Sequence, residues 1–145
     1  MKYLKTFLKM PWKQKLLIPQ ILVLMVYYRF RVHKRPFSEL APTIGTMGHE
    51  TPVEATPRDA WLVHEIMESL FRKLKWKDSC LIRALTAKKL LNRMGQKCTL
   101  YMGVCKNGND PMKAHAWLRC GKLIVTGGES KAGFTVTAVF GDKEE

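Results

Sequence analysis

A helix pattern followed at once by a series of strand patterns is the feature that most constrains the fold. Asp78 is a typical N-cap residue and Gly95 a typical helix terminator, so a helix is predicted between them. Small and apolar residues recur on one face of this helix, namely Cys80, Ala84, Ala87 and Leu91. The alanines beside Cys80 would let a strand approach the helix closely.

Four strand patterns follow that helix, each bounded by residues that favour turns. The expected strands cover 97–104, 114–120, 123–126 and 134–140. The expected turns cover 107–110, 121–122 and 127–128. Helices first and an antiparallel sheet after them predict an α+β domain.

A second helix pattern precedes Asp78. Thr56 is a suitable N-cap and Pro57 suits the first helical position, and apolar residues then recur at helical spacing to about Trp76. Proline and glycine are frequent from Pro36 to Pro57, which predicts a linker with a short helical turn near 37–40. We therefore expect a main domain over 56–145, preceded by an arm over 1–55.

The arm combines an apolar run with basic ends. Lysines precede the run Leu16–Tyr28, and Arg29, Arg31, Lys34 and Arg35 follow it. No small-residue cleavage site follows the run, and its uncharged part is shorter than the roughly 20 residues that span a bilayer. Two interpretations stay open: a helix packed on the main domain, or an interfacial helix lying on a membrane or a partner protein.

Composition narrows the class of protein. The hydrophobic fraction of 46% is enough for a packed core, and a net charge of +13 favours an acidic partner or an anionic membrane surface. No nucleic-acid reader motif and no phosphate-binding loop accompanies the charge, so we expect no nucleic-acid partner.

The four cysteines form no C-x-x-C pair or zinc spacing, which predicts a reduced cytoplasmic protein without a metal or cofactor.

Cys80 and His115 together suggest a thiol-nucleophile site. The first turn of a helix presents unpaired amides and the positive dipole end to a side chain, which favours a thiolate. His115 begins an expected strand, and an imidazole beside the sulfur would take the thiol proton and return it to a leaving amine. The backbone amide of Cys80 would help to bind the oxyanion. In an arbitrary protein, both residues are more often structural.

Four segments resemble the transglutaminase-like cysteine peptidases of lasso-peptide biosynthesis. They are Cys80–Leu85 (C-L-I-R-A-L), Leu90–Gly95 (L-L-N-R-M-G), Leu100–Val104 (L-Y-M-G-V) and Ala114–Leu118 (A-H-A-W-L). The resemblance covers roughly Thr56 to Phe140, and the arm looks like the front of stand-alone members. It implies a transglutaminase/papain-like core, with helices packed on an antiparallel sheet.

The resemblance also implies a function. Such proteins remove the leader from a ribosomally made precursor peptide. A small leader-recognition protein presents the precursor to them, and an asparagine-synthetase-like cyclase then closes the ring. By position, Cys80 would be the nucleophile and His115 the general base and acid. The arm is too short and too apolar to be the fused recognition domain, so a separate recognition protein is expected, with membrane contact through the arm as an alternative role.

One position departs from the family pattern. The family often has an aspartate twelve residues beyond the histidine, where this chain has Gly127. Glu129 is the weak candidate for a third catalytic member, ahead of Asp78 and Asp110, and a backbone carbonyl is a further alternative. A non-catalytic peptide-binding scaffold and an acyl transferase are therefore kept as alternative functions.

Overall fold

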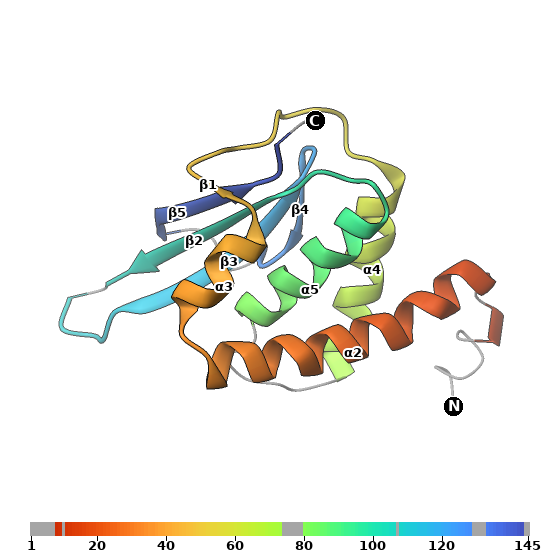
Figure 1. Cartoon of the computed structure of the whole chain (residues 1–145), viewed down its shortest axis with the longest axis horizontal. Coiled ribbons are helices and arrows are strands. Elements are labelled where there is room, and N and C mark those ends of the chain that lie inside the picture. Colours follow the sequence, from red (N-terminus) through yellow and green to blue (C-terminus); the bar gives the residue numbers. More distant parts are fainter. Residues whose placement is uncertain (1–7, 10, 74–79, 107, 129–132, 144–145) are drawn as a thin grey trace.

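The computed structural model of the chain describes residues 8–9, 11–73, 80–106, 108–128 and 133–143. It has the predicted α+β architecture (Figure 1). The helices of the described residues are α2 (Trp12–Lys34), α3 (Phe37–Ile44), α4 (Arg58–Lys73) and α5 (Cys80–Arg93). The strands are β1 (Thr46–Met47), β2 (Thr99–Cys105), β3 (Lys113–Cys120), β4 (Leu123–Thr126) and β5 (Thr135–Gly141).

The strands form one antiparallel sheet in the order β1-β5-β2-β3-β4. The four strands predicted after the helix pattern are β2, β3, β4 and β5, with bounds shifted by no more than two residues. β1 was not predicted, because two residues in a proline- and glycine-rich segment carry no alternation. It pairs Thr46 with Gly141 and Met47 with Phe140, and so joins the arm to the sheet.

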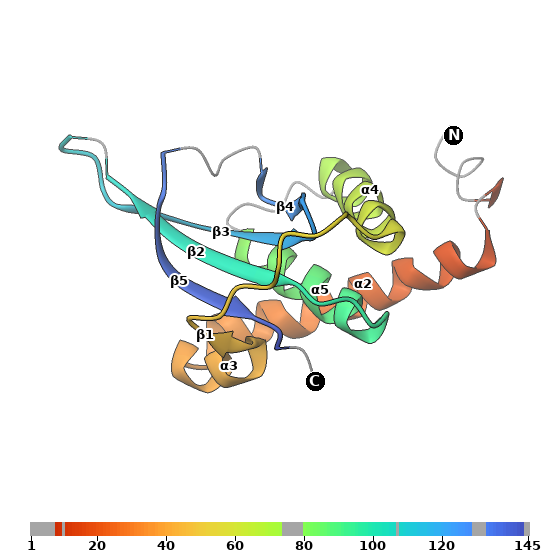
Figure 2. The same cartoon turned by 90° about the horizontal axis from the view of Figure 1, so that it is seen from above.

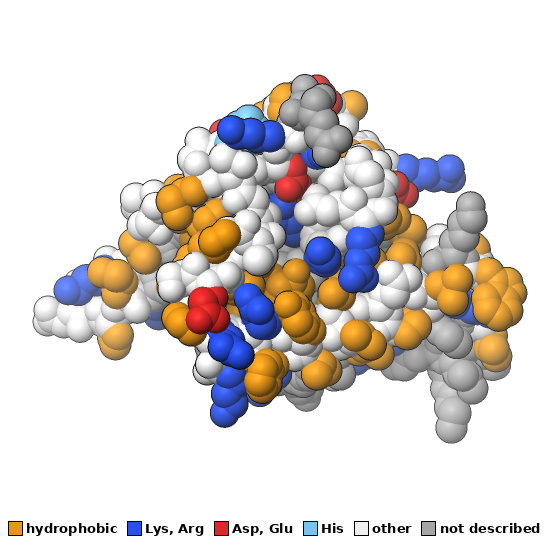
Figure 3. All heavy atoms as spheres, viewed as in Figure 1, with side chains coloured by type: hydrophobic (Ala, Val, Ile, Leu, Met, Phe, Trp, Pro, Cys, Tyr) orange, Lys and Arg blue, Asp and Glu red, His pale blue; other side chains and the backbone are white. Residues whose placement is uncertain are grey.

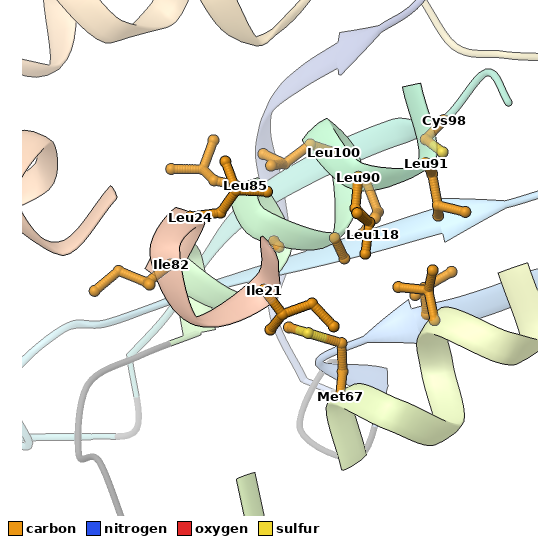
Figure 4. Packing of buried hydrophobic residues seen from close by; sticks show 14 of the residues in the cluster. Ile21, Leu24, Met67, Ile82, Leu85, Leu90, Leu91, Cys98, Leu100 and Leu118 are labelled. Atoms are coloured by element: carbon orange, nitrogen blue, oxygen red, sulfur yellow. The ribbon is translucent and has the colours of Figure 1, made fainter. Parts of the chain in front are cut away.

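The hydrophobic core lies between the sheet and the helices, and α2, α3, α4 and α5 all contribute buried residues to it (Figure 2). Leu100, Leu118 and Phe140 face this core from the sheet, each at most 1% exposed. The cluster in Figure 4 shows side chains from three helices meeting the sheet: Ile21 and Leu24 from α2, Met67 from α4, and Ile82, Leu85, Leu90 and Leu91 from α5. The apolar periodicity of the sequence thus corresponds to one continuous core.

The end of α5 follows the prediction. Gly95 has a φ of +83°, the left-handed conformation that favours glycine. The Gly95 amide donates to the Asn92 carbonyl at 3.0 Å, and the Gln96 amide to the Leu91 carbonyl at 2.9 Å. These two bonds satisfy carbonyls of the last turn and turn the chain toward β2.

The start of α4 differs from the prediction, because the helix begins at Arg58 rather than at Pro57 and Thr56 bonds to another segment. The Thr56 hydroxyl accepts a hydrogen bond from the Lys122 amide at 3.2 Å, so it ties this segment to the β3–β4 turn. The first turn of α4 is closed by the Ala60 amide, which donates to the Pro57 carbonyl at 3.1 Å. The sequence could not show this because the partner lies 66 residues away. The described helix runs to Lys73, and the expected end near Trp76 lies outside the described residues.

α2 confirms the apolar helix with basic ends, and it runs through Pro19 without ending there. Its inner face is buried and contacts α5, and comprises Leu17, Ile21, Leu24, Met25 and Tyr28. An 18-residue window within Gln14–Lys34 has a mean hydropathy of 1.2, so by length and composition this helix is long and apolar enough to cross a membrane. The expectation that the run is too short is therefore wrong, because the helix extends beyond its uncharged part. The division of the chain at residue 55 stays a prediction.

Candidate active site

Cys80 is the first residue of α5, and its side chain is half-buried against the hydrophobic core. α5 packs on β3, the strand that carries His115. Among the described residues, α5 begins at Cys80, in agreement with the predicted helix start. Asp78, the expected cap and a weak catalytic candidate, lies outside the described residues.

His115 is the third residue of β3 and stands opposite Gly103 of β2. Its Nε2 atom lies 2.8 Å from the carbonyl oxygen of Gly127. One side of the ring stacks on Trp117, with centroids 5.7 Å apart, and the Phe134 ring lies 5.2 Å away. The imidazole is thus held by one hydrogen bond and two aromatic neighbours.

The hydrogen bond to Gly127 determines which nitrogen of His115 is basic. A carbonyl oxygen can only accept, so Nε2 must carry the hydrogen. In the neutral ring, the lone pair then lies on Nδ1. Nδ1 is therefore the atom that can accept a proton from a nucleophile.

Gly127 occupies the position at which the family pattern often has aspartate. Its φ is +76°, and a Cβ there would lie 2.6 Å from the Ala116 carbonyl oxygen and 3.0 Å from the Trp117 Cβ. A side chain at residue 127 is excluded unless the backbone moves. The backbone oxygen of this residue, rather than a carboxylate, bonds to the histidine.

The other candidates for the third catalytic member are not brought to His115 by any described contact. Glu129 lies outside the described residues, so its role stays a prediction. Asp110 is exposed in the turn between β2 and β3. Its placement agrees with the interpretation of a turn residue.

The alternation of side chains along β3 determines how Cys80 could reach His115. Ala116 and Leu118 face the helix-covered core, so His115 and Trp117 belong to the opposite face. In the described part of the chain, β4 pairs with β3 only between Leu118 and Cys120, and the edge upstream of Leu118 has no strand beside it there. The Cys80 sulfur would therefore have to reach the His115 imidazole past this edge of β3.

The family assignment comes from residues 22–139, which match the model of the transglutaminase-like superfamily. The chain belongs to the transglutaminase-like superfamily. The match begins within α2 and ends in β5, so it includes both Cys80 and His115. This superfamily includes cysteine peptidases and acyltransferases. No curated protein and no solved structure is significantly similar to the chain.

Two other cysteines of this transglutaminase-like chain form a buried pair, and none of the four cysteines forms a disulfide. Cys98 is 0% exposed and Cys120 is 1% exposed. The hydrogen bond between them, with burial, raises the pKa of Cys98, and the same bond lowers the pKa of Cys120. Their burial separates them from solvent, whereas Cys80 and Cys105 are half-buried.

Sequence reasoning missed the aromatic surroundings of His115. Trp117 lies two residues away on the same strand, so the period of two already predicts that both side chains share one face. Tyr101 extends the stack from β2, with its ring centroid 5.7 Å from that of Trp117. Phe134 had no such signal, because it comes from a distant segment of the chain.

Proposed function

We propose that this chain is a cysteine peptidase that removes the leader from a ribosomally made lasso-peptide precursor, with Cys80 as nucleophile and His115 as general base and acid. The observation that carries the proposal is the bond from His115 Nε2 to the Gly127 carbonyl, because it leaves Nδ1 as the proton acceptor. A histidine with a defined basic nitrogen is what a thiol nucleophile requires. The superfamily assignment supports the thiol chemistry.

The proposed reaction has two stages. Nδ1 of His115 takes the proton of the Cys80 thiol, and the sulfur attacks the carbonyl carbon at the end of the leader. The C–N bond breaks, His115 gives its proton to the leaving amine, and a thioester to the leader remains. Water then attacks the thioester, which releases the leader carboxylate and restores the thiol. The amide of Cys80 would stabilise the oxyanion in both stages.

The lasso-peptide part of the proposal is supported by the four sequence segments around Cys80 and His115. The implied partners are the precursor, a separate leader-recognition protein and a cyclase. The net charge of +13 suits an acidic leader or partner. Four cysteines without a disulfide suit a reducing cytoplasm.

The test is the mass of the product formed from a cognate precursor and its recognition protein. We expect a free leader ending in a carboxylate, together with a core peptide beginning with an amine. A leader joined to an added amine would identify an acyl transferase. An unchanged precursor that nevertheless binds the chain would identify a non-catalytic scaffold. Either of the last two results contradicts the peptidase assignment.

A further inference from the structure

The outward face of α2 exposes an unusual number of large apolar side chains. Trp12 is 77% exposed, Val23 is 67% exposed and Phe30 is 59% exposed. Leu16, Val26 and Tyr27 are also exposed at 49–63%. At 100° per residue these side chains lie on one side of the helix, opposite the buried face that includes Ile21 and Tyr28. We call this set of six exposed residues the α2 stripe.

The α2 stripe makes the helix apolar on both sides. The inner face belongs to the core, so packing within this fold explains why that face is apolar but not why the outer face is. A surface helix of a globular domain ordinarily has charged or polar residues on its outer face. Extended exposed apolar patches of this kind mark interaction sites. The stripe therefore requires an apolar partner outside the described fold.

Charge indicates the nature of that partner. The first 35 residues contain nine lysines and arginines and no aspartate or glutamate. In α2 itself, Arg31, His33 and Lys34 occupy the last turn. Figure 3 shows apolar side chains along the α2 edge of the molecule, with Lys and Arg gathered near one end. An apolar stripe with basic ends matches a surface that is apolar inside and anionic outside.

We propose that α2 binds the surface of an anionic lipid bilayer, with its axis in the plane of the membrane and the α2 stripe inserted among the lipids. The helix does not cross the bilayer in the folded protein, because Ile21, Met25 and Tyr28 are held in the core. Trp12 and Tyr27 have the amphipathic rings that membrane interfaces favour. A second copy of the chain is a poor partner, because dimerisation through the stripe would bring two basic helices together.

The experiment is co-sedimentation of the full chain with lipid vesicles. Vesicles of phosphatidylcholine that also contain phosphatidylglycerol should bind the chain, and vesicles of phosphatidylcholine alone should bind it much less. Val23→Glu should weaken binding about tenfold or more, since it replaces an apolar side chain that would insert among the lipids with a negative charge. Lys34→Gln should weaken binding about fivefold and reduce its dependence on salt. Phe30→Gln provides a second stripe variant.

The matched control is Val53→Glu. Val53 is 66% exposed and lies outside α2, so the two glutamate variants make the same change at equal exposure. Val53→Glu should bind vesicles as the wild type does, and circular dichroism should show the same folded structure in all variants. Equal binding by Val23→Glu and wild type would overturn the proposal. The proposal would also be overturned if the wild-type chain did not bind anionic vesicles but formed a dimer or bound a protein partner through the α2 stripe. Cys80→Ala should bind vesicles normally, so this result is independent of the peptidase proposal.

Discussion

Replacement of Cys80 with alanine is expected to lower the rate of precursor cleavage to background, roughly four orders of magnitude or more below the wild-type rate. Alanine removes the sulfur that would form the thioester, and no other described cysteine begins a helix. His115→Ala should lower the rate by roughly 10²–10⁴, the usual contribution of general acid–base catalysis. The measurement is the single-turnover rate of leader release, with the recognition protein present.

Cys105→Ala is the matched control for that prediction. Cys105 is also half-buried and outside any disulfide, but it lies at the end of β2 rather than at a helix start. This variant should cleave the precursor at a rate close to that of the wild type. Leader release that survives in Cys80→Ala, or that is lost equally in Cys105→Ala, would remove Cys80 from the mechanism. Thermal unfolding of each variant separates loss of catalysis from loss of folding.

Asp142→Ala is expected to destabilise the fold by about 3–5 kcal/mol. The carboxylate of Asp142 lies 2.5 Å from Lys88 Nζ, accepts from Asn92 Nδ2 at 2.6 Å and accepts from the Cys98 amide at 2.9 Å. The Lys88 side chain is only 3% exposed, so the variant leaves a buried cation without its counter-charge. At roughly 3 °C per kcal/mol, the melting temperature should fall by about 10 °C or more.

Two variants test the cause of this destabilisation. Glu39→Ala removes an exposed ion pair, in which Arg35 and Glu39 are 3.8 Å apart, and should cost at most about 1 kcal/mol. Adding Lys88→Met to Asp142→Ala should recover part of the lost stability, because the buried charge is then absent. A melting temperature of Asp142→Ala within 2–3 °C of the wild type, about 1 kcal/mol, would mean that the buried pair contributes little. No recovery in the double variant would assign the loss to the hydrogen bonds of Asn92 and Cys98 instead.

Local patterns in the sequence were sufficient for most of the secondary structure. Leu123–Thr126 is bounded by Gly121-Lys122 and Gly127-Gly128, and β4 has the predicted bounds. Gly95 ends α5 because only the last turn and its own left-handed φ are involved. β1 and the bond between Thr56 and Lys122 depend on residues far away in the chain, and no local pattern encodes them.

In the candidate site, too, some features follow from local sequence and others depend on the tertiary fold. The location of Cys80 at a helix start and of His115 on a strand follows from local sequence. The group that orients His115 does not, because a backbone carbonyl has no side-chain signature. In the sequence, Gly127 predicts only the end of a strand. The tertiary fold brings its carbonyl oxygen to Nε2 of His115. The aspartate that the family pattern suggests would not fit at this φ and spacing.

The most direct test of a Cys80–His115 pair is the rate at which iodoacetamide alkylates Cys80 at about neutral pH, measured for each cysteine by mass spectrometry. Only the thiolate reacts, so an imidazole within reach of the sulfur should accelerate the reaction. Cys80 should react at least about tenfold faster in the wild type than in His115→Ala, while Cys105 reacts equally in both. Equal rates for Cys80 in the two proteins would show that the sulfur and the imidazole do not act together.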